Sequence, residues 1–290
     1  MAPRVTVIIA TYNWSSVLRF AVASVLRQTF TDFELLVVGD GCTDDSADIV
    51  AGAADPRVQW INLPANTGHQ SGPNNEGLRR ARGEIVAYLG HDDLWLPHHL
   101  ASLVAALDRT GSDLAYALAI NVESDGSAWP TVPRPRDGRF SSPLSMAHRR
   151  RVTEEMGGWR DYRELSDTPD VELWRRAQAR GYAFTFVPRL TGIKFPAGSR
   201  RGVYQTRPAD QQSAWFARIE REPDVESEAL VQVIVSAGAD SWTGLSYREL
   251  VDGVVGQVRR RARARARLPS LGLFPRPGQL IAAVRRFKGL

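Results

Sequence analysis

Short apolar runs alternate with amphipathic stretches through about the first ninety residues of the chain. The segment Val5–Ala10 is a largely β-branched run, which predicts a buried strand. After a polar loop, Ser15 or Ser16 can cap a helix whose apolar positions recur at helical spacing as far as Gln28. The same alternation then predicts strands at Phe33–Val38, Val58–Asn62 and Glu84–Leu89 and helices at Ser46–Ala54 and Glu76–Arg82.

This order of elements predicts an α/β fold with a mostly parallel sheet flanked by helices. Ligands of such sheets bind beyond the carboxyl ends of the strands, where polar clusters follow three of the predicted strands. The clusters are Thr11-Tyr12-Asn13, Asp40-Gly41 and His91-Asp92-Asp93. A dinucleotide-binding domain carries a glycine fingerprint after its first strand, whereas the loop ATYNWSS contains no glycine. The sequence therefore argues against that class of protein.

Two adjacent acids, Asp92 and Asp93, directly follow the last of these strands. Neighbouring carboxylates repel each other unless a cation, hydrogen bonds or solvent compensates, and hard oxygen ligands of this kind suit Mg²⁺ or Mn²⁺. A helix-capping acid ahead of Pro97 is the structural alternative. The pair by itself is weak evidence for a metal site, and the upstream sequence strengthens it.

Composition is that of a globular protein with one main domain. Hydrophobic residues make up 43% and charged residues 24% of the 290 residues, and no apolar run approaches the roughly 20 residues of a membrane span. The apolar part of MAPRVTVIIATYN is too short for a signal peptide, and the single cysteine, Cys42, cannot form an internal disulfide. These features predict a cytoplasmic protein.

The net charge of +5 is concentrated near the C-terminus. Residues 253–290 contain ten Lys or Arg and no Asp or Glu, so removing these ten charges leaves −5 on the preceding residues. An acidic body argues against nucleic acid as a partner, because recognition of a phosphate backbone needs positive charge on the working surface.

Three segments are expected along the chain: a main domain at residues 1–208, a helical extension at 209–258 and a basic tail at 259–290. The tail begins with RRRARARAR and continues with Leu280, Ile281, Val284 and Phe287 at helical spacing beside basic residues. A basic amphipathic helix of this kind can lie on an anionic membrane surface, here the inner face of the membrane. A solvated or disordered tail is the alternative.

Four motifs in order resemble the inverting family 2 glycosyltransferases, which have the nucleotide-sugar-binding GT-A fold. They are VIIATYNW, ELLVVGDGCTDDS, NTGHQSGPNNEGLRRARGEIVAYLGHDDLW and EEMGGWRDYRELSDTPDVELWRRAQARGY, and they span roughly residues 5 to 196. The resemblance implies that residues 1–208 bind a nucleoside diphosphate sugar, use Mn²⁺ or Mg²⁺, and transfer the sugar to a hydroxyl of a glycan, lipid-linked or small-molecule acceptor.

Carried over by position, the resemblance assigns Thr11 and Tyr12 to the base and ribose pocket, with Tyr12 able to stack on a pyrimidine. It implies that Asp40 accepts the imide N–H of uracil or thymine, so UDP or dTDP is the favoured donor nucleotide. Asn75 and Asp92 are further donor-binding candidates, and Asp92 and Asp93 are the candidate metal ligands. The structural alternatives are an ordinary half-buried aromatic for Tyr12 and a turn-forming acid for Asp40.

The general base implied by the resemblance is Asp170. Pro169 predicts a helix start and Gly181 its end, so Asp170 lies in the first turn, where it can remove the proton of an acceptor hydroxyl. Electrostatic stabilisation of the helix N-terminus is the alternative role. Asp167 is the reserve candidate for the base.

The sequence also departs from the family pattern. Gly90 replaces the first acid of the usual Asp-any-Asp-Asp motif and His91 takes the variable position, while Lys194 lies where the family often supplies a metal-binding histidine. These departures keep a second function class open, a non-catalytic protein of the same fold that binds nucleotide sugars or glycans. Residues 124–145 are expected to form a loop over the site, and Trp159 is either a sugar-stacking residue or part of the core.

Overall fold

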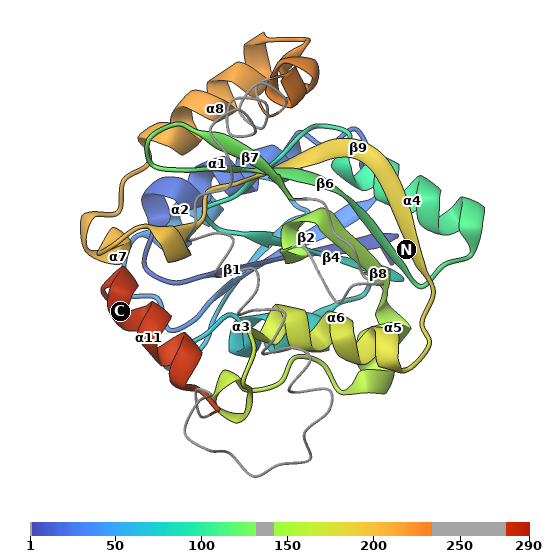
Figure 1. Cartoon of the computed structure of the whole chain (residues 1–290), viewed down its shortest axis with the longest axis horizontal. Coiled ribbons are helices and arrows are strands. Elements are labelled where there is room, and N and C mark those ends of the chain that lie inside the picture. Colours follow the sequence, from blue (N-terminus) through green and yellow to red (C-terminus); the bar gives the residue numbers. More distant parts are fainter. Residues whose placement is uncertain (1, 132–141, 232, 234–276) are drawn as a thin grey trace, which may run out of the picture.

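The computed structural model describes residues 2–131, 142–231, 233 and 277–290. In this part of the chain a nine-stranded sheet has the order β3-β2-β1-β4-β8-β6-β9-β5, with β7 paired to β6 (Figure 1). The first half of the sheet is parallel, as the sequence predicts. It consists of β1 (Val5–Thr11), β2 (Phe33–Gly39), β3 (Val58–Asn62) and β4 (Ile85–Gly90).

The second half of the sheet is mixed. Strand β8 (Met146–Arg149) is antiparallel to both β4 and β6 (Leu114–Val122), and β6 runs parallel to β9 (Phe184–Lys194). The short strands β5 (Leu94–Trp95) and β7 (Ala128–Thr131) pair antiparallel with β9 and β6. Strand β7 lies within the segment predicted to be a loop, of which residues 132–141 lie outside the described residues.

Helices cover both faces of the sheet because alternate residues of its buried strands point to opposite sides. Val7 and Ile9 pack in one cluster with α1 (Ser15–Leu26) and α4 (His99–Thr110), on the face where α2 (Ser46–Ala51) also packs. Ile8 and Val86 pack in a second cluster, which includes side chains of the helices on the other face (Figure 1). These helices are α5 (Arg150–Met156) and α6 (Pro169–Ala179), with α3 (Ser71–Arg80) beside them.

Helix α3 begins five residues earlier than the sequence pattern predicts. Its first turns read SGPNNEG, a composition typical of a loop, yet Ser71, Asn74 and Gly77 form a buried stripe. A side chain at Gly77 would place its Cβ 2.7 Å from Cγ2 of Ile8, so glycine allows the helix to approach β1 closely. Tertiary packing therefore overrides local propensity here.

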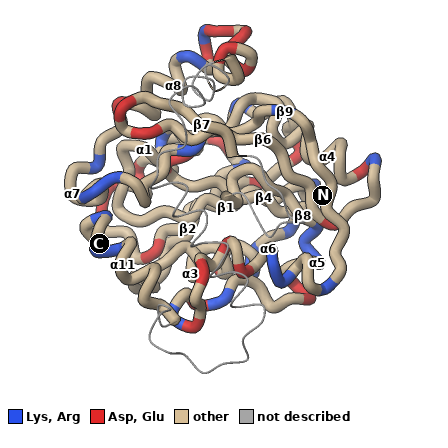
Figure 2. The backbone as a smooth tube through the Cα atoms, in the orientation of Figure 1, with Lys and Arg blue, Asp and Glu red and all other residues tan. Residues whose placement is uncertain are grey.

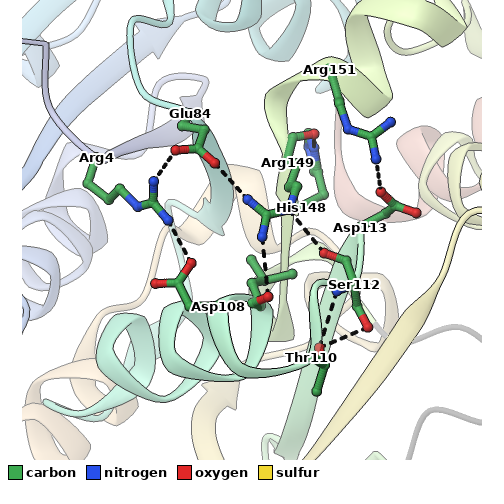
Figure 3. Close-up of polar contacts among 10 residues, drawn as sticks. Arg4, Glu84, Asp108, Thr110, Ser112, Asp113, His148, Arg149 and Arg151 are labelled. Atoms are coloured by element: carbon green, nitrogen blue, oxygen red, sulfur yellow. Dashed lines mark hydrogen bonds and ion pairs between the residues drawn. The ribbon is translucent and has the colours of Figure 1, made fainter.

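A polar network joins the amino ends of β1 and β4 to β8 (Figure 3). Glu84 pairs with Arg4 and with Arg149, whose guanidinium also donates to the backbone oxygens of Ser112 and Leu107, each at 3.2 Å. Arg149 lies at the strand ends opposite to those where polar clusters were predicted. We therefore assign this network to the attachment of the antiparallel strand β8 rather than to ligand binding.

C-terminal elements pack back onto the sheet domain. Helix α8 (Asp210–Arg221) contacts α1, where the Phe20 and Phe216 rings lie 5.6 Å apart, and it shares a buried cluster with β5 and β9. The described end of the predicted tail forms helix α11 (Gln279–Lys288). Part of the predicted extension and the whole RRRARARAR segment lie outside the described residues. In the described part, every helix is too short or too polar to cross a membrane.

Candidate functional site

A cavity of about 520 Å³ opens at the carboxyl ends of β1, β2 and β4. Among the residues predicted from the sequence, Thr11, Tyr12, Asp40, Asp92, Asp93 and Asp170 line this cavity, and Asn75 does not. Lys194, Tyr204 and one face of helix α11 complete the wall from distant parts of the sequence. The tertiary structure thus brings together the three polar clusters that follow the predicted strands.

His91 positions two tyrosines of the cavity. Its Nδ1 accepts the backbone N–H of Tyr12 at 3.3 Å and lies 2.9 Å from Oγ1 of Thr11, so the ring proton belongs on Nε2, which lies 3.2 Å from the Tyr204 hydroxyl. Burial lowers the pKa of His91 to about 4, which keeps the imidazole neutral at physiological pH. The residue in the variable position of the motif therefore organises the site.

Asp40 anchors the loop that leads into α3. One carboxylate oxygen accepts hydrogen bonds from the backbone N–H and the hydroxyl of Thr67, at 2.8 and 2.7 Å, and the other accepts the N–H of Gly68 at 3.2 Å. A carboxylate has about four acceptor positions, so one remains for a ligand. These bonds join Asp40 to a loop 27 residues away and not to its own turn, and the carboxylate also faces the cavity.

The buried carboxylate of Asp93 forms an ion pair with Lys194, whose side chain is 31% exposed. Oδ1 of Asp93 accepts the N–H of Phe195 at 3.0 Å, and Oδ2 lies 3.4 Å from the Lys194 ammonium. Burial raises the pKa of Asp93 to about 6 although Lys194 opposes this shift. Burial alone would lower the pKa of Lys194, but the carboxylates of Asp93, Asp92 and Asp170 outweigh it and raise that pKa. Both oxygens of Asp93 are therefore engaged by the protein.

Gly90 leaves room for this pair of acids. A Cβ at position 90 would lie 2.7 Å from Oδ2 of Asp93 and 3.0 Å from Oδ1 of Asp92. Such separations are shorter than van der Waals contact, so an acid at this position would displace the two carboxylates. The departure from the family motif is therefore matched to the local packing.

Of the two adjacent acids, Asp92 is better placed than Asp93 to be a ligand of a divalent metal. Among the described side chains no hydrogen-bond donor contacts the Asp92 carboxylate, which faces the cavity. No group of three or more His, Cys, Asp or Glu suited to a metal is present in the described part. Mg²⁺ is commonly bound by one or two carboxylates together with substrate phosphates and water, and Asp92 can supply one such ligand. The carboxylate of Asp93, the second predicted metal ligand, instead contacts Lys194 and the backbone N–H of Phe195.

Asp170 lies in the first turn of α6 and faces the cavity, as predicted. Its carboxylate contributes to the field at Lys194, which places it near the acids that follow β4. The reserve candidate, Asp167, does not line the cavity and lies 2.6 Å from Arg175 in an ion pair. Of the two candidates for the base, only Asp170 therefore lies on the cavity wall.

Two further residues have structural roles. The side-chain amide of Asn75 exchanges hydrogen bonds of 2.8 Å with the backbone of Trp159, which removes it from the donor pocket. Trp159 is 3% exposed, so the core alternative holds for this residue. Trp129 of β7 instead is 47% exposed and lines the cavity. Sequence reasoning missed Trp129 because the segment around it lacks periodicity.

A mostly parallel sheet flanked by helices is the architecture of GT-A glycosyltransferase structures. Residues 6–180 match the sequence profile described as Glycosyl transferase family 2, and the chain belongs to this family. The fold is also that of Staphylococcus aureus TarS residues 1–349 in complex with UDP-GlcNAc, with a TM-score of 0.59 at 20% identity over 79% of this chain and 70% of that one. A mannosyltransferase of Pyrobaculum calidifontis with GDP-Man and Mn²⁺ has a TM-score of 0.55 at 20% identity, over 98% and 87% of the two chains.

Curated relatives include an uncharacterized glycosyltransferase of Nostoc, 41% identical over 180 residues, which are 53% of each chain. A GalNAc(5)-diNAcBac-PP-undecaprenol beta-1,3-glucosyltransferase of Campylobacter jejuni is 34% identical over 107 residues, covering 35% of this chain and 34% of that one. The chain thus spans about half the length of the Nostoc relative and less of the Campylobacter enzyme.

Proposed function

We propose that the protein is an inverting glycosyltransferase that moves a sugar from UDP or dTDP to a hydroxyl of a glycan, lipid-linked or small-molecule acceptor. Family membership supports sugar transfer. The proposed base, metal ligand and nucleotide pocket are supported by one observation. Asp92, Asp170 and Lys194 line the same cavity as Tyr12 and Asp40. A base, a candidate metal ligand and a nucleotide pocket thereby lie within reach of one bound donor.

In the proposed mechanism Asp170 takes the proton of the acceptor hydroxyl while the oxygen attacks the anomeric carbon. The new bond forms on the face opposite the leaving nucleoside diphosphate, whose bond to the carbon breaks, so the configuration inverts. Asp92, with diphosphate oxygens, is the proposed ligand of Mn²⁺ or Mg²⁺, which when bound offsets the charge of the leaving group. Lys194 contributes a further fixed positive charge to the same region.

The acceptor is proposed to lie beside Trp129, opposite the nucleotide pocket. An exposed indole on the cavity wall offers an apolar face on which a sugar ring can stack. Relatives from Campylobacter and Escherichia are named for undecaprenol-diphosphate-linked acceptors, which supports a lipid-linked glycan here. Asn121 and Thr131 line the cavity near this indole and offer hydrogen-bonding groups.

The proposal is tested by a screen of nucleoside diphosphate sugars with Mn²⁺ and with Mg²⁺, in which transfer and slow donor hydrolysis are both measured. We expect turnover of a UDP or dTDP sugar, and a product of inverted configuration by NMR. Binding of a donor with neither transfer nor hydrolysis would favour the non-catalytic alternative, for which the loss of the first motif acid at Gly90 is the motive. Retained configuration would contradict the single displacement.

Asp40 is proposed to select the base. We expect Asp40→Asn to weaken UDP binding by about 1.5–3 kcal/mol, the range for a hydrogen bond to a charged group. Because Asp40 also holds Thr67, Thr67→Val is the matched control: it removes one loop hydrogen bond and leaves the carboxylate in place. Titration calorimetry with UDP and GDP checks this. A native preference for GDP, or equal UDP affinity of Asp40→Asn and the native protein, contradicts the assignment.

A further inference from the structure

Helix α11 is fixed against the cavity at both of its ends. The backbone N–H of Gly278, just before the helix, donates to the oxygen of Leu165 at 2.8 Å. Near the other end, the N–H of Gly202 donates to the oxygen of Phe287, also at 2.8 Å. Ile281 is buried between these anchors. The helix is therefore attached to the main domain at two places, Leu165 and Gly202.

One face of α11 forms part of the cavity wall. Ile281, Val284, Arg285 and Lys288 line the cavity, and their spacing places them on one side of a helix. Arg286 lies on the exposed side of the same helix and is absent from the cavity lining. Figure 2 shows the basic positions of α11 in blue beside α7 (Val203–Thr206). The predicted amphipathic helix thus exists, but the structure does not support membrane contact through Arg285 and Lys288, because they face the protein.

Two basic side chains of α11, those of Arg285 and Lys288, line the cavity without an ion pair to any described residue. Arg285 donates to the backbone oxygen of Gly68, a neutral partner, and within the described residues Lys288 makes no ion pair. Burial lowers the pKa of Lys288; Asp92 opposes this shift, while Lys194 and Arg285 add to it. The cavity lining as a whole has four carboxylates, those of Asp40, Asp92, Asp93 and Asp170, and three basic side chains, those of Lys194, Arg285 and Lys288. Because neither Arg285 nor Lys288 is held in an ion pair by a described residue, both can form charge-assisted hydrogen bonds with a ligand anion.

We propose that Arg285 and Lys288 bind the diphosphate of the donor, so that α11 completes the nucleotide-sugar site opposite Lys194. This inference rests on the proposed function, since it needs a diphosphate in this cavity. The two side chains lie one helical turn apart, and Asp92 interacts electrostatically with Lys288, so the metal ligand and these cations face the same space. Anions of this kind form strong charge-assisted hydrogen bonds with Arg and Lys.

The experiment compares UDP with uridine, which lacks the phosphates, by titration calorimetry on the full chain. Lys288→Ala is expected to weaken UDP binding about 10- to 100-fold and to leave uridine binding within about twofold, the loss of one charge-assisted contact. Arg286→Ala is the matched control, with the same change of charge on the exposed face of the same helix, and it is expected to bind both ligands as the native protein does. Lys288→Arg is expected to restore most of the UDP affinity.

Equal UDP affinity of Lys288→Ala and Arg286→Ala overturns the inference, and so does an equal loss of uridine and UDP affinity in Lys288→Ala. Sugar transfer by the native protein, measured in parallel, keeps the two proposals apart. Native turnover together with an unaffected Lys288→Ala variant removes the role of α11 and leaves the glycosyltransferase. A third outcome is that Lys288→Ala weakens UDP binding but not uridine binding, while the native protein neither transfers sugar nor hydrolyses a donor. This outcome supports the role of α11 and contradicts catalysis.

Discussion

At the scale of single residues, the site depends on a division of roles among acids that the sequence presents alike. The Asp92 carboxylate faces the cavity and accepts no hydrogen bond from the described residues, Asp93 is held by Lys194 and the backbone, and Asp40 holds a loop. These differences follow from what surrounds each carboxylate and not from residue type. Substitutions at these positions are therefore expected to fail in different ways.

Asp170→Asn should lower turnover by about 10²–10⁴-fold while donor affinity stays within a few-fold of native, because a general base acts on the acceptor in the transition state. Asp167→Asn is the matched control, since that acid lies outside the cavity in an ion pair with Arg175. Steady-state kinetics and donor titration with the same protein samples provide the two measurements. Native turnover in Asp170→Asn would show that the base lies elsewhere.

Gly90→Ala should weaken metal-dependent donor binding, because the added Cβ would lie 2.7 Å from Asp93 and 3.0 Å from Asp92. We expect a lower donor affinity in the presence of Mn²⁺, and the overpacking itself should cost about 1–3 kcal/mol of folding stability. Gly198→Ala serves as the control, as a Cβ there meets no atom within 4 Å. Donor titration with and without Mn²⁺ measures both variants. An unchanged metal-dependent affinity for Gly90→Ala would mean that the two acids adjust without cost.

At the scale of elements, the strands differ in how they are fixed. The parallel strands β1, β2 and β4 are held by continuous backbone pairing and by apolar side chains on both faces. Strand β8 pairs with β4 over only three residues, and Arg149 adds contacts to Glu84 and to two backbone oxygens (Figure 3). We therefore expect this arginine to contribute to folding and not to ligand binding.

Arg149→Ala should lower the free energy of unfolding by about 1–3 kcal/mol, because the backbone oxygen of Ser112 loses its side-chain donor and the ion pair with Glu84 is lost. Arg151→Ala, two positions along, removes the same charge from a side chain that is 52% exposed, and we expect a change below about 1 kcal/mol. Urea unfolding measures both variants, and UDP affinity should remain native in each. Equal stability of the two variants would contradict a special role for Arg149.

At the scale of the whole molecule, the buried histidines make stability depend on pH. Burial lowers the pKa of His148 to about 4, and the pKa values of His69, His91 and His99 are lowered for the same reason. Between these values and the ordinary value of 6.5, the unfolded chain binds more protons than the folded chain does. Stability therefore falls as the pH falls through this range. Asp93 has a raised pKa and therefore contributes the opposite dependence, a gain of stability as the pH falls, but it is one group against several histidines.

His148→Gln should show a smaller loss of stability than the native protein when the pH is lowered from about 7 to 5, since one fully affected histidine contributes up to about 1.4 kcal/mol per pH unit. Glutamine keeps a polar partner for the Tyr88 hydroxyl, which lies 3.1 Å from the His148 ring. Urea unfolding at both pH values gives the difference for each protein. The variant is expected to be less stable at pH 7, and an unchanged pH dependence would contradict the assignment.

Local sequence was sufficient to predict the parallel half of the sheet and the family. The runs at Val5–Ala10 and Phe33–Val38 are long, apolar and bounded by turn residues, and a strand buried on both faces requires this pattern. Because parallel strands end at one edge, the same pattern also brought Thr11, Asp40 and Asp92 to the cavity. These features depend on local periodicity and on connections between neighbouring elements.

The far wall of the cavity and the state of each acid depend instead on the tertiary structure. Tyr204 and Lys288 come from late in the chain and meet His91 and Asp92 through folding, with no spacing in the sequence to indicate it, whereas the family resemblance already placed Lys194 at the site. The early start of α3 and the removal of Asn75 from the pocket likewise depend on packing against β1 and on the backbone of Trp159. Periodicity records which side of an element is buried, whereas partners and pKa values depend on contacts between segments that are far apart in sequence.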